Sequence, residues 1–364
     1  MLVDRGRIFE DRLDPDRKLF PTWLPKPYPT DLAIGPTQLD RLIKSPVRVG
    51  KVDDCVALLC KRWLSVTAVI GMLSSLLLAD IIQNVRAALA ESNVAVAISQ
   101  LENYRSAHGV DPEYLEGASW VARAYLSRNQ LDQADGWAKQ VETSSRQLLE
   151  HRELDAEPHL LIALGAALEV EAQSLVLRGE KSQAAALLRR NLATYGGTLL
   201  RARLQKNLNL IGFEGKPAPS LGLTKYIGIR PTPLNQLMGF PVLLFFWAHW
   251  CTDCKQEGPI LAQLNSEFSP KGLKLEAPTQ FYGYAAYGQE ATPQAEFDYI
   301  GHVWRQYYAG LQEIAVPVSK GNFDKYGAST TPTLVLIDRQ GHIALYHPGF
   351  MSYNDLRAAI EKAM

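Results

Sequence analysis

The sequence predicts two folded parts, an all-α region over residues 80–212 and an α/β domain over residues 213–364. Residues 80–212 are rich in Ala and Leu, contain few Pro, and keep a helical spacing of apolar residues throughout. After residue 213, strand and helix patterns alternate, as is typical of an α/β domain. With 364 residues, 47% of them hydrophobic, the chain can bury more than one core.

Two segments precede the helical region. Residues 1–60 are rich in Pro and charge without sustained periodicity, which predicts a disordered leader. Residues 61–79 begin with Lys61-Arg62 and continue as an uncharged, largely apolar run. This pattern predicts a signal peptide or a membrane anchor, with a buried core helix as the alternative. Because signal peptides begin proteins, either translation starts downstream of residue 1, or residues 1–60 are the cytoplasmic tail of an anchored protein.

The helical region contains two helix–turn–helix patterns. One runs from Trp120 to Ala134, and the other runs from Leu175 to Leu188 with a turn at Arg178-Gly179. Both resemble tetratricopeptide (TPR) units, although the two are spaced more widely than regular repeats. The region is therefore interpreted either as a TPR-like array that binds a peptide or protein, or as a plain helical bundle that supports the α/β domain.

The α/β domain is predicted to contain five strands and three helices. A helix begins with Thr292 as its N-cap and Pro293 at its first position. Residues 338–341 (DRQG) predict a hairpin turn between the last two strands. The predicted strands are Val242–Trp247, Gln280–Tyr287, Ile314–Ser319, Leu334–Ile337 and Ile343–His347, and the other two helices are Cys251–Phe268 and Tyr353–Lys362.

The most informative residues lie at two strand ends. Cys251 and Cys254 follow an apolar strand and stand on the first turn of a helix. Two thiols at this spacing can close a small disulfide, and the helix start favours the thiolate of Cys251. Thr331-Pro332 stands about 80 residues later, just before another strand. Together the two segments indicate dithiol–disulfide chemistry.

These segments resemble the thioredoxin superfamily and, more narrowly, the exported TlpA/ResA/CcmG-type thiol–disulfide oxidoreductases. Residues 215–219 (GKPAP) and 234–243 (LNQLMGFPVL) resemble two further segments of that family, so the resemblance covers roughly residues 213–364. It implies a thioredoxin-like α/β fold with a helical insertion after the second strand. The family pattern Trp-Cys-x-x-Cys-x-x-Glu-x-Pro is met by Trp250, Cys251, Cys254, Glu257 and Pro259.

The resemblance implies roles for the two cysteines and the proline loop. Cys251 would be the attacking thiolate and Cys254 the buried resolving thiol, joined as a redox-active disulfide. Thr331 and Pro332 would form a cis-proline loop that binds an extended substrate beside the disulfide. Glu257 falls on the helix face of Cys254, where a carboxyl could relay the proton of that thiol.

Neighbouring aromatic and charged residues refine this expectation. Trp250 is expected to shield the disulfide and bind substrate, and Trp247 to lie in the core. His249 either titrates beside Cys251 or, as the favoured expectation, is an exposed bystander. Phe245 stands where thioredoxins carry a buried Asp, so any proton relay depends on Glu257. The charge of Asp253 should oppose thiolate formation at Cys251, which predicts a reductant or isomerase-like poise rather than a strong oxidant.

Other uses of the cysteine pair fit the sequence less well. A structural zinc site needs four ligands, and Cys55 and Cys60 lie far upstream. A c-type haem would require His where Lys255 stands. Peroxiredoxins place a Thr three residues before the reactive cysteine, where this chain has Ala248 or Cys251. An adaptor that uses the thioredoxin-like domain only as a scaffold is the non-enzymatic alternative.

The resemblance also implies the partners. They are disulfide-containing or dithiol proteins of the cell envelope, such as apocytochrome c, and an upstream dithiol protein that supplies electrons; no bound cofactor and no metal is required. A formal net charge of zero gives no electrostatic case for nucleic acid. Because the only cysteines after residue 80 are Cys251 and Cys254, an oxidising, extracytoplasmic location is expected, either free in the periplasm or outside the cell, or tethered to the inner membrane.

Overall fold

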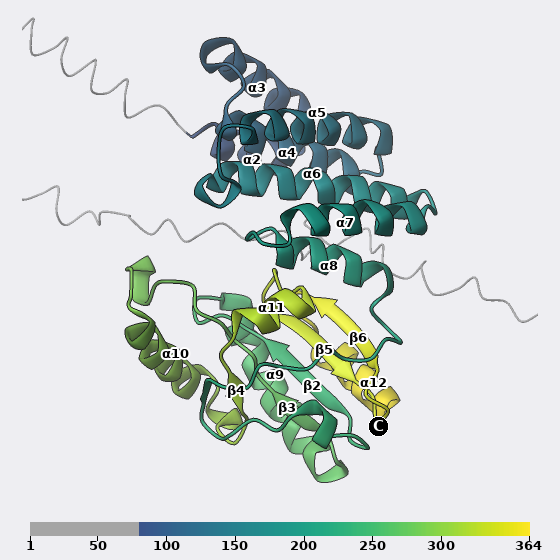
Figure 1. The fold of residues 1–364 in the computed structure, drawn as a ribbon, viewed down its shortest axis with the longest axis vertical. Coiled ribbons are helices and arrows are strands. Elements are labelled where there is room, and N and C mark those ends of the chain that lie inside the picture. Colours follow the sequence, from purple (N-terminus) through teal and green to yellow (C-terminus); the bar gives the residue numbers. More distant parts are fainter. Residues whose placement is uncertain (1–79) are drawn as a thin grey trace, which may run out of the picture. The chain divides into compact units, whose positions relative to one another are not determined.

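A computed structural model describes residues 80–364, which divide into two compact units, residues 80–170 and 171–364 (Figure 1). The predicted leader and the predicted signal peptide or anchor lie outside the described residues. The first unit is helical and the second contains the sheet, so an all-α region followed by an α/β domain is confirmed. Helices α7 (Lys181–Tyr195) and α8 (Arg201–Gly212) belong to the unit that contains the sheet.

The first unit consists of helices that are joined by short connections. Asp80, Asn93 and Asp111 each cap a helix, because their side-chain oxygens accept a hydrogen bond from a backbone N–H of the first turn. The helices are α2 (Ile81–Ala90), α3 (Val94–His108), α4 (Pro112–Ser127), α5 (Leu131–Leu149) and the first part of α6 (Pro158–Leu177). The predicted turn between Trp120 and Ala134 is present between α4 and α5. The identification of these helices as TPR-like stays a prediction.

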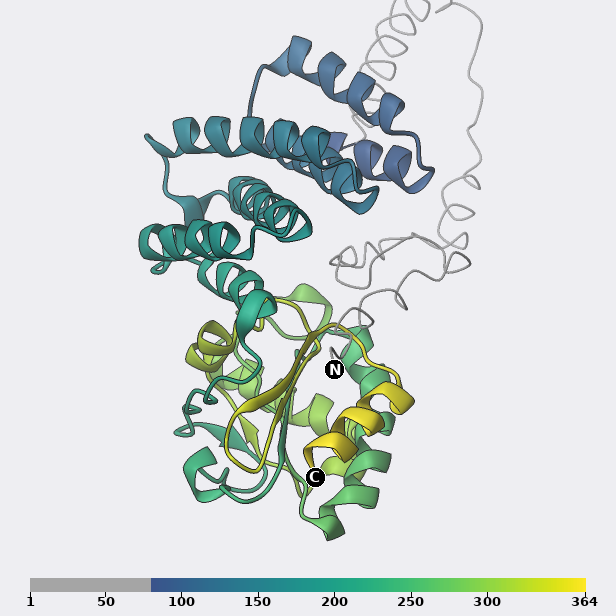
Figure 2. The same ribbon diagram turned by 90° about the vertical axis from the view of Figure 1, so that its right-hand side faces the viewer.

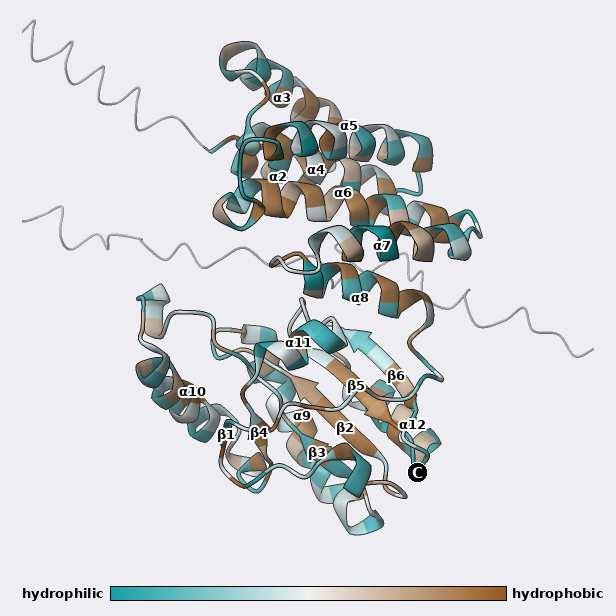
Figure 3. Ribbon diagram, in the orientation of Figure 1, coloured by the Kyte–Doolittle hydropathy of each residue, from teal (hydrophilic) through white to brown (hydrophobic). Residues whose placement is uncertain are grey.

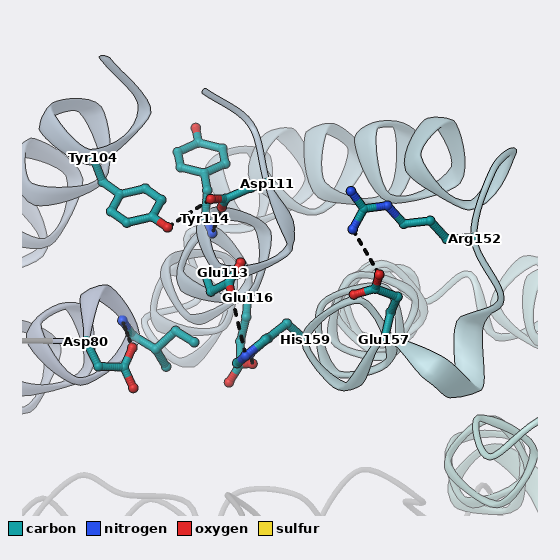
Figure 4. A network of polar contacts seen from close by, with 10 residues as sticks. Asp80, Tyr104, Asp111, Glu113, Tyr114, Glu116, Arg152, Glu157 and His159 are labelled. Carbon is teal, nitrogen blue, oxygen red and sulfur yellow. Dashed lines mark hydrogen bonds and ion pairs between the residues drawn. The ribbon is translucent and has the colours of Figure 1, made fainter. Parts of the chain in front are cut away.

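Polar contacts fix the ends of these helices against one another (Figure 4). Asp111 Oδ2 accepts a hydrogen bond from the hydroxyl of Tyr104 on α3 at 2.8 Å, while Oδ1 accepts from the backbone N–H of Tyr114. His159 Nδ1 lies 2.8 Å from Glu116 Oε2 and so joins the start of α6 to α4. His159 thus has a structural role in linking the two helices.

Within the described residues, α6 is the one helix long and apolar enough to cross a membrane by length and composition. Its most apolar window is 61% buried within the protein. Glu169 on this helix lies 3.7 Å from Arg123 of α4, and both side chains are almost fully buried. These properties are those of a core helix in a helical domain.

Helix α8 packs on α11 (Lys320–Tyr326) of the α/β unit. Asn209 donates a hydrogen bond to the backbone oxygen of Tyr326 at 2.9 Å. Gly327 ends α11 with a φ of +62°, and a Cβ at this position would overlap the backbone of Gln205 and Lys206 on α8. The contact therefore requires glycine for both its left-handed conformation and its lack of a side chain.

The sheet has four strands in the order β3-β2-β5-β6. Strand β2 is parallel to β3 and antiparallel to β5, and β5 is antiparallel to β6. Every residue of β2 and β5 is buried, as expected for the two central strands. The strands are β3 (Lys274–Glu276), β2 (Val242–Phe246), β5 (Thr333–Ile337) and β6 (Ile343–Pro348), and a separate pair is formed by β1 (Tyr226–Ile227) and β4 (Val316–Pro317).

A hydrophobic core lies on each face of the sheet, and helices cover both faces (Figure 2). Helices α9 (Thr252–Phe268), α10 (Pro293–Tyr307) and α12 (Tyr353–Ala363) cover one face, and α11 covers the other. Alternate residues of β2 feed the two cores, with Phe245 on the α9 side and Phe246 on the α11 side. Hydrophobic residues line β2 and β5 along their length (Figure 3).

One predicted strand is wrong. Residues 280–287 form an irregular loop ending in a short 3₁₀ turn, Ala286–Gly288, and the strand beside β2 is instead Lys274–Glu276. The alternating aromatic residues in this segment mimic a strand pattern, but the backbone N–H groups of Tyr282 and Gly283 are bound by the side chain of Glu296. The predicted helix cap at Thr292, the hairpin turn at residues 338–341 and the final helix are present.

Replacing Gly327 by Ala is expected to destabilise the protein by about 2–4 kcal/mol, because strain at positive φ adds to overlap with α8. Gly239→Ala is the matched control, since its φ is +89° but no atom lies near the new Cβ. Urea unfolding of the full chain measures both variants. Equal losses in the two would contradict the proposed steric requirement.

Candidate active site

The two cysteines lie where β2 leads into α9. Cys251 is the N-cap of α9, and its sulfur accepts a hydrogen bond from the backbone N–H of Cys254 at 3.0 Å. The pair forms a disulfide with Cα atoms 5.3 Å apart. Cys251 keeps 4% of its surface exposed whereas Cys254 has none, so an incoming thiolate can reach only the sulfur of Cys251.

The proline loop faces this sulfur. The Thr331–Pro332 peptide bond is cis, and the carbonyl oxygen of Thr331 lies 3.4 Å from Cys251 Sγ. Thr333 begins β5 and pairs with Phe246 at the end of β2, which brings the loop to the cysteine turn. The structure therefore brings together the two segments that the sequence singled out, 80 residues apart.

Glu257 is fully buried one turn beyond Cys254 on α9. Its Oε2 accepts a hydrogen bond from the backbone N–H of Met351 at 3.2 Å, while Oε1 has no hydrogen-bond partner. Burial raises the pKa of Glu257 to about 8, and the nearby charge of Asp253 acts in the same direction against the Met351 hydrogen bond. The carboxyl is therefore mostly protonated near neutral pH and can give up its proton at slightly alkaline pH.

The aromatic residues before Cys251 divide between core and surface. Trp247 is completely buried and donates its indole N–H to the backbone oxygen of Ala277 at 3.0 Å, as expected for a core residue. The side chain of Trp250 is 44% exposed beside the disulfide, and its ring meets that of Tyr282 edge-on at 5.5 Å. Trp250 is thus available to a molecule that approaches Cys251.

His249 is not the exposed bystander that the sequence suggested. Its side chain is 1% exposed, and Nε2 lies 3.3 Å from Oε1 of the equally buried Glu296. Three tyrosine rings surround the imidazole edge-on at 5.3–5.6 Å, namely Tyr282, Tyr284 and Tyr299. Burial lowers the pKa of His249 against the attraction of Glu296. Sequence reasoning missed Glu296, because an acidic residue in the first turn of a helix is usually solvated.

The described residues contain no group of three or more His, Cys, Asp or Glu side chains arranged to hold a metal ion. Cys55 and Cys60 lie outside the described part of the chain. The arrangement at Cys251 and Cys254, a disulfide with one slightly exposed cysteine next to a cis-proline and a buried carboxyl, is that of a dithiol–disulfide site.

This geometry defines the class of the α/β unit. Residues 236–364 match the family model described as a thioredoxin-like domain. The α/β unit is therefore a thioredoxin-like domain with the Cys-x-x-Cys pair at the start of its first long helix.

Two curated relatives and a solved structure are similar to this part of the chain. The thioredoxin-like protein YneN of Bacillus subtilis is 25% identical over 151 residues, covering 41% of this chain and 79% of that protein. The thiol-disulfide oxidoreductase ResA of Bacillus thuringiensis is 28% identical over 150 residues, covering 41% and 77%. A thiol:disulfide interchange protein of the thioredoxin family from Chlorobium tepidum aligns with a TM-score of 0.31 at 18% identity, covering 41% of this chain and 95% of that one.

The buried Glu257 should make stability fall as pH rises. The folded protein keeps the proton up to a pKa of about 8, whereas the unfolded chain releases it near the ordinary value of 4.5. Between these values the unfolded state binds fewer protons, so this group lowers the free energy of unfolding by up to about 1.4 kcal/mol for each pH unit.

Glu257→Gln removes this titration. As the pH rises from about 5 to about 7, the difference in unfolding free energy between the variant and the parent should shift by about 2 kcal/mol in favour of the variant. Urea unfolding of the oxidised full chain at both pH values measures the difference. A constant difference across this range would show that Glu257 titrates normally.

Proposed function

We propose that this protein is an exported thiol–disulfide oxidoreductase that reduces or exchanges disulfides of other proteins. The carrying observation is that Cys251 at the start of α9 faces the cis-Pro332 loop and is the one cysteine of the pair with any exposed surface, while Cys254 is completely buried. The relatives named thiol-disulfide oxidoreductase support this activity. So does the sequence, which has no other cysteine after residue 80 and so suits an oxidising compartment.

The reaction transfers two electrons by two sulfur exchanges. In the reduced protein, the Cys251 thiolate attacks a substrate disulfide, forms a mixed disulfide and releases one substrate sulfur as a thiolate. The Cys254 thiolate then attacks Cys251 Sγ, closes the internal disulfide and releases the second substrate sulfur. A reducing dithiol protein regenerates the pair by the same steps in reverse, so no cofactor is needed.

Glu257 serves as the proton donor and acceptor for Cys254. When a reductant thiolate attacks Cys251 Sγ, the bond to Cys254 breaks and negative charge develops on a buried sulfur. A neutral carboxyl one helical turn away can supply the proton, and its pKa of about 8 matches this task. In the opposite direction the Glu257 carboxylate takes the proton from Cys254 and activates it for the resolving attack.

Trp250 and the Thr331–Pro332 loop form the binding surface around Cys251. Trp250 supplies an exposed aromatic face directly before the reactive cysteine. The loop supplies backbone groups that an extended peptide can pair with. Envelope proteins with disulfides or dithiols, apocytochrome c among them, are the proposed partners. A membrane tether at residues 61–79 and peptide binding by the helical unit belong to the same proposal.

Cys254→Ser is expected to trap substrates, because the mixed disulfide on Cys251 can no longer be resolved. After expression in an envelope, non-reducing gels should show reductant-sensitive adducts that Cys251→Ser and the double variant lack. If Cys254→Ser captures nothing covalently while it stays folded, the adaptor alternative is favoured instead.

Glu257→Gln should slow reduction of the disulfide by about 100-fold near neutral pH, since general acid catalysis is lost. Stopped-flow tryptophan fluorescence with excess dithiothreitol measures this rate. Glu267→Gln is the control, because Glu267 is on the same helix but pairs with Arg357 at the surface. A similar rate in both variants would remove Glu257 from the mechanism.

A further inference from the structure

The carboxylate of Glu296 joins the turn that carries Cys251 to a neighbouring loop. It projects from the first turn of the inserted helix α10 and is 1% exposed. Its Oε1 accepts a hydrogen bond from the backbone N–H of Tyr282, and its Oε2 accepts one from Gly283 at 2.9 Å. The remaining partner is His249 Nε2 at 3.3 Å. Loop 282–290 is thereby joined to the strand-to-helix turn that carries Cys251.

His249 enters this arrangement as a hydrogen-bond donor. Because carboxylate oxygens only accept, the hydrogen of the imidazole is on Nε2, and the buried Nδ1 has no hydrogen-bond partner. Edge-on tyrosine rings leave the imidazole little room to turn. A buried donor that lost its acceptor here would keep the full cost of desolvation, so the pair holds its geometry firmly.

The exposed Trp250 belongs to one of the two segments that Glu296 joins, and its ring contacts the other. It directly follows His249 in the chain, and its ring packs edge-on against Tyr282. Glu296 therefore fixes both sides of the Trp250 contact, through the imidazole before it and through the backbone of its ring partner. The same loop continues to Tyr287, whose side chain is 99% exposed on a turn closed by a hydrogen bond between the Ala285 N–H and the Gln289 oxygen.

We propose that Glu296 and His249 are positioning residues that hold Trp250 and loop 282–290 to receive an extended polypeptide carrying a disulfide, and so favour protein disulfides over small ones. The inference rests on the proposed oxidoreductase activity. A small disulfide needs to reach only the sulfur of Cys251, whereas a polypeptide also covers Trp250 and the loop. Loss of the Glu296–His249 pair should therefore lower the rate constant for protein disulfides more than the rate constant for small ones.

The test compares two probes, insulin as a protein disulfide and 5,5′-dithiobis(2-nitrobenzoate) as a small one. The pre-reduced full chain is mixed with each probe, and the dependence on insulin concentration separates half-saturation from the limiting rate. Glu296→Gln should lower the second-order rate constant on insulin at least about five-fold, mainly through half-saturation, because one buried donor loses its acceptor. Its loss on the small probe should be clearly smaller.

Two further comparisons distinguish positioning from general loosening of the fold. His249→Gln keeps an N–H that can donate to Glu296 and should retain more insulin activity than His249→Leu. In a Trp250→Ala background, Glu296→Gln should cause a smaller loss than it does alone, because part of its effect passes through that ring. Asp298→Asn is the matched control, an exposed carboxylate on the same helix as Glu296 but outside the proposed binding surface, and should leave both probes unaffected.

Equal losses on both probes, full additivity with Trp250→Ala, or an unaffected Glu296→Gln variant would each overturn this inference while leaving the oxidoreductase activity intact. If the parent protein reacted with neither probe, the proposed function itself would fail. If Glu296→Gln does not fold, the comparison of His249→Gln with His249→Leu decides the question, since both keep the carboxylate.

Discussion

The active site depends on the register between β2 and β5. Phe246 at the end of β2 lies opposite Thr333 at the start of β5, so the segment leading to Cys251 and the Pro332 loop leave the sheet at the same edge. Both strands are buried on both faces, and alternate residues fill different cores. A shift of one residue would exchange the side chains of β5 between two closely packed cores. Packing of the sheet thus fixes the approach of Thr331 to the reactive sulfur.

Two buried glutamates near the cysteines have different roles because their hydrogen-bond partners differ. Glu257 has a single backbone donor and a free oxygen, so burial dominates and raises its pKa. Glu296 receives two backbone N–H groups and an imidazole N–H, which satisfy its oxygens within the fold. The carboxyl of Glu257 can therefore exchange its proton, whereas the contacts of Glu296 hold the neighbouring segments in place.

Much of this could be predicted from the sequence because it is local. The Cys251–Cys254 spacing, the apolar β2, the cap at Thr292 and the turn at residues 338–341 each depend on residues a few positions apart. The loop at residues 280–287 was mistaken for a strand because its aromatic alternation is also local, while the carboxylate that binds its backbone comes from α10. The burial of His249 escaped prediction for the same reason, since its partner lies 47 residues away.

This division between local and distant determinants also separates the chemistry from its selectivity. The cysteine turn, Glu257 and the Pro332 loop lie on or beside β2, α9 and β5, whose packing cannot change without disturbing the sheet. Glu296 lies on the inserted helix α10, and most of loop 282–290 is at the surface. Substitutions in this insertion can alter which polypeptide fits beside Trp250 while the reacting sulfurs stay in place. A carboxylate that connects the inserted helix to the residue before Trp250 is therefore a direct route by which the insertion can act on the surface around the reactive cysteine.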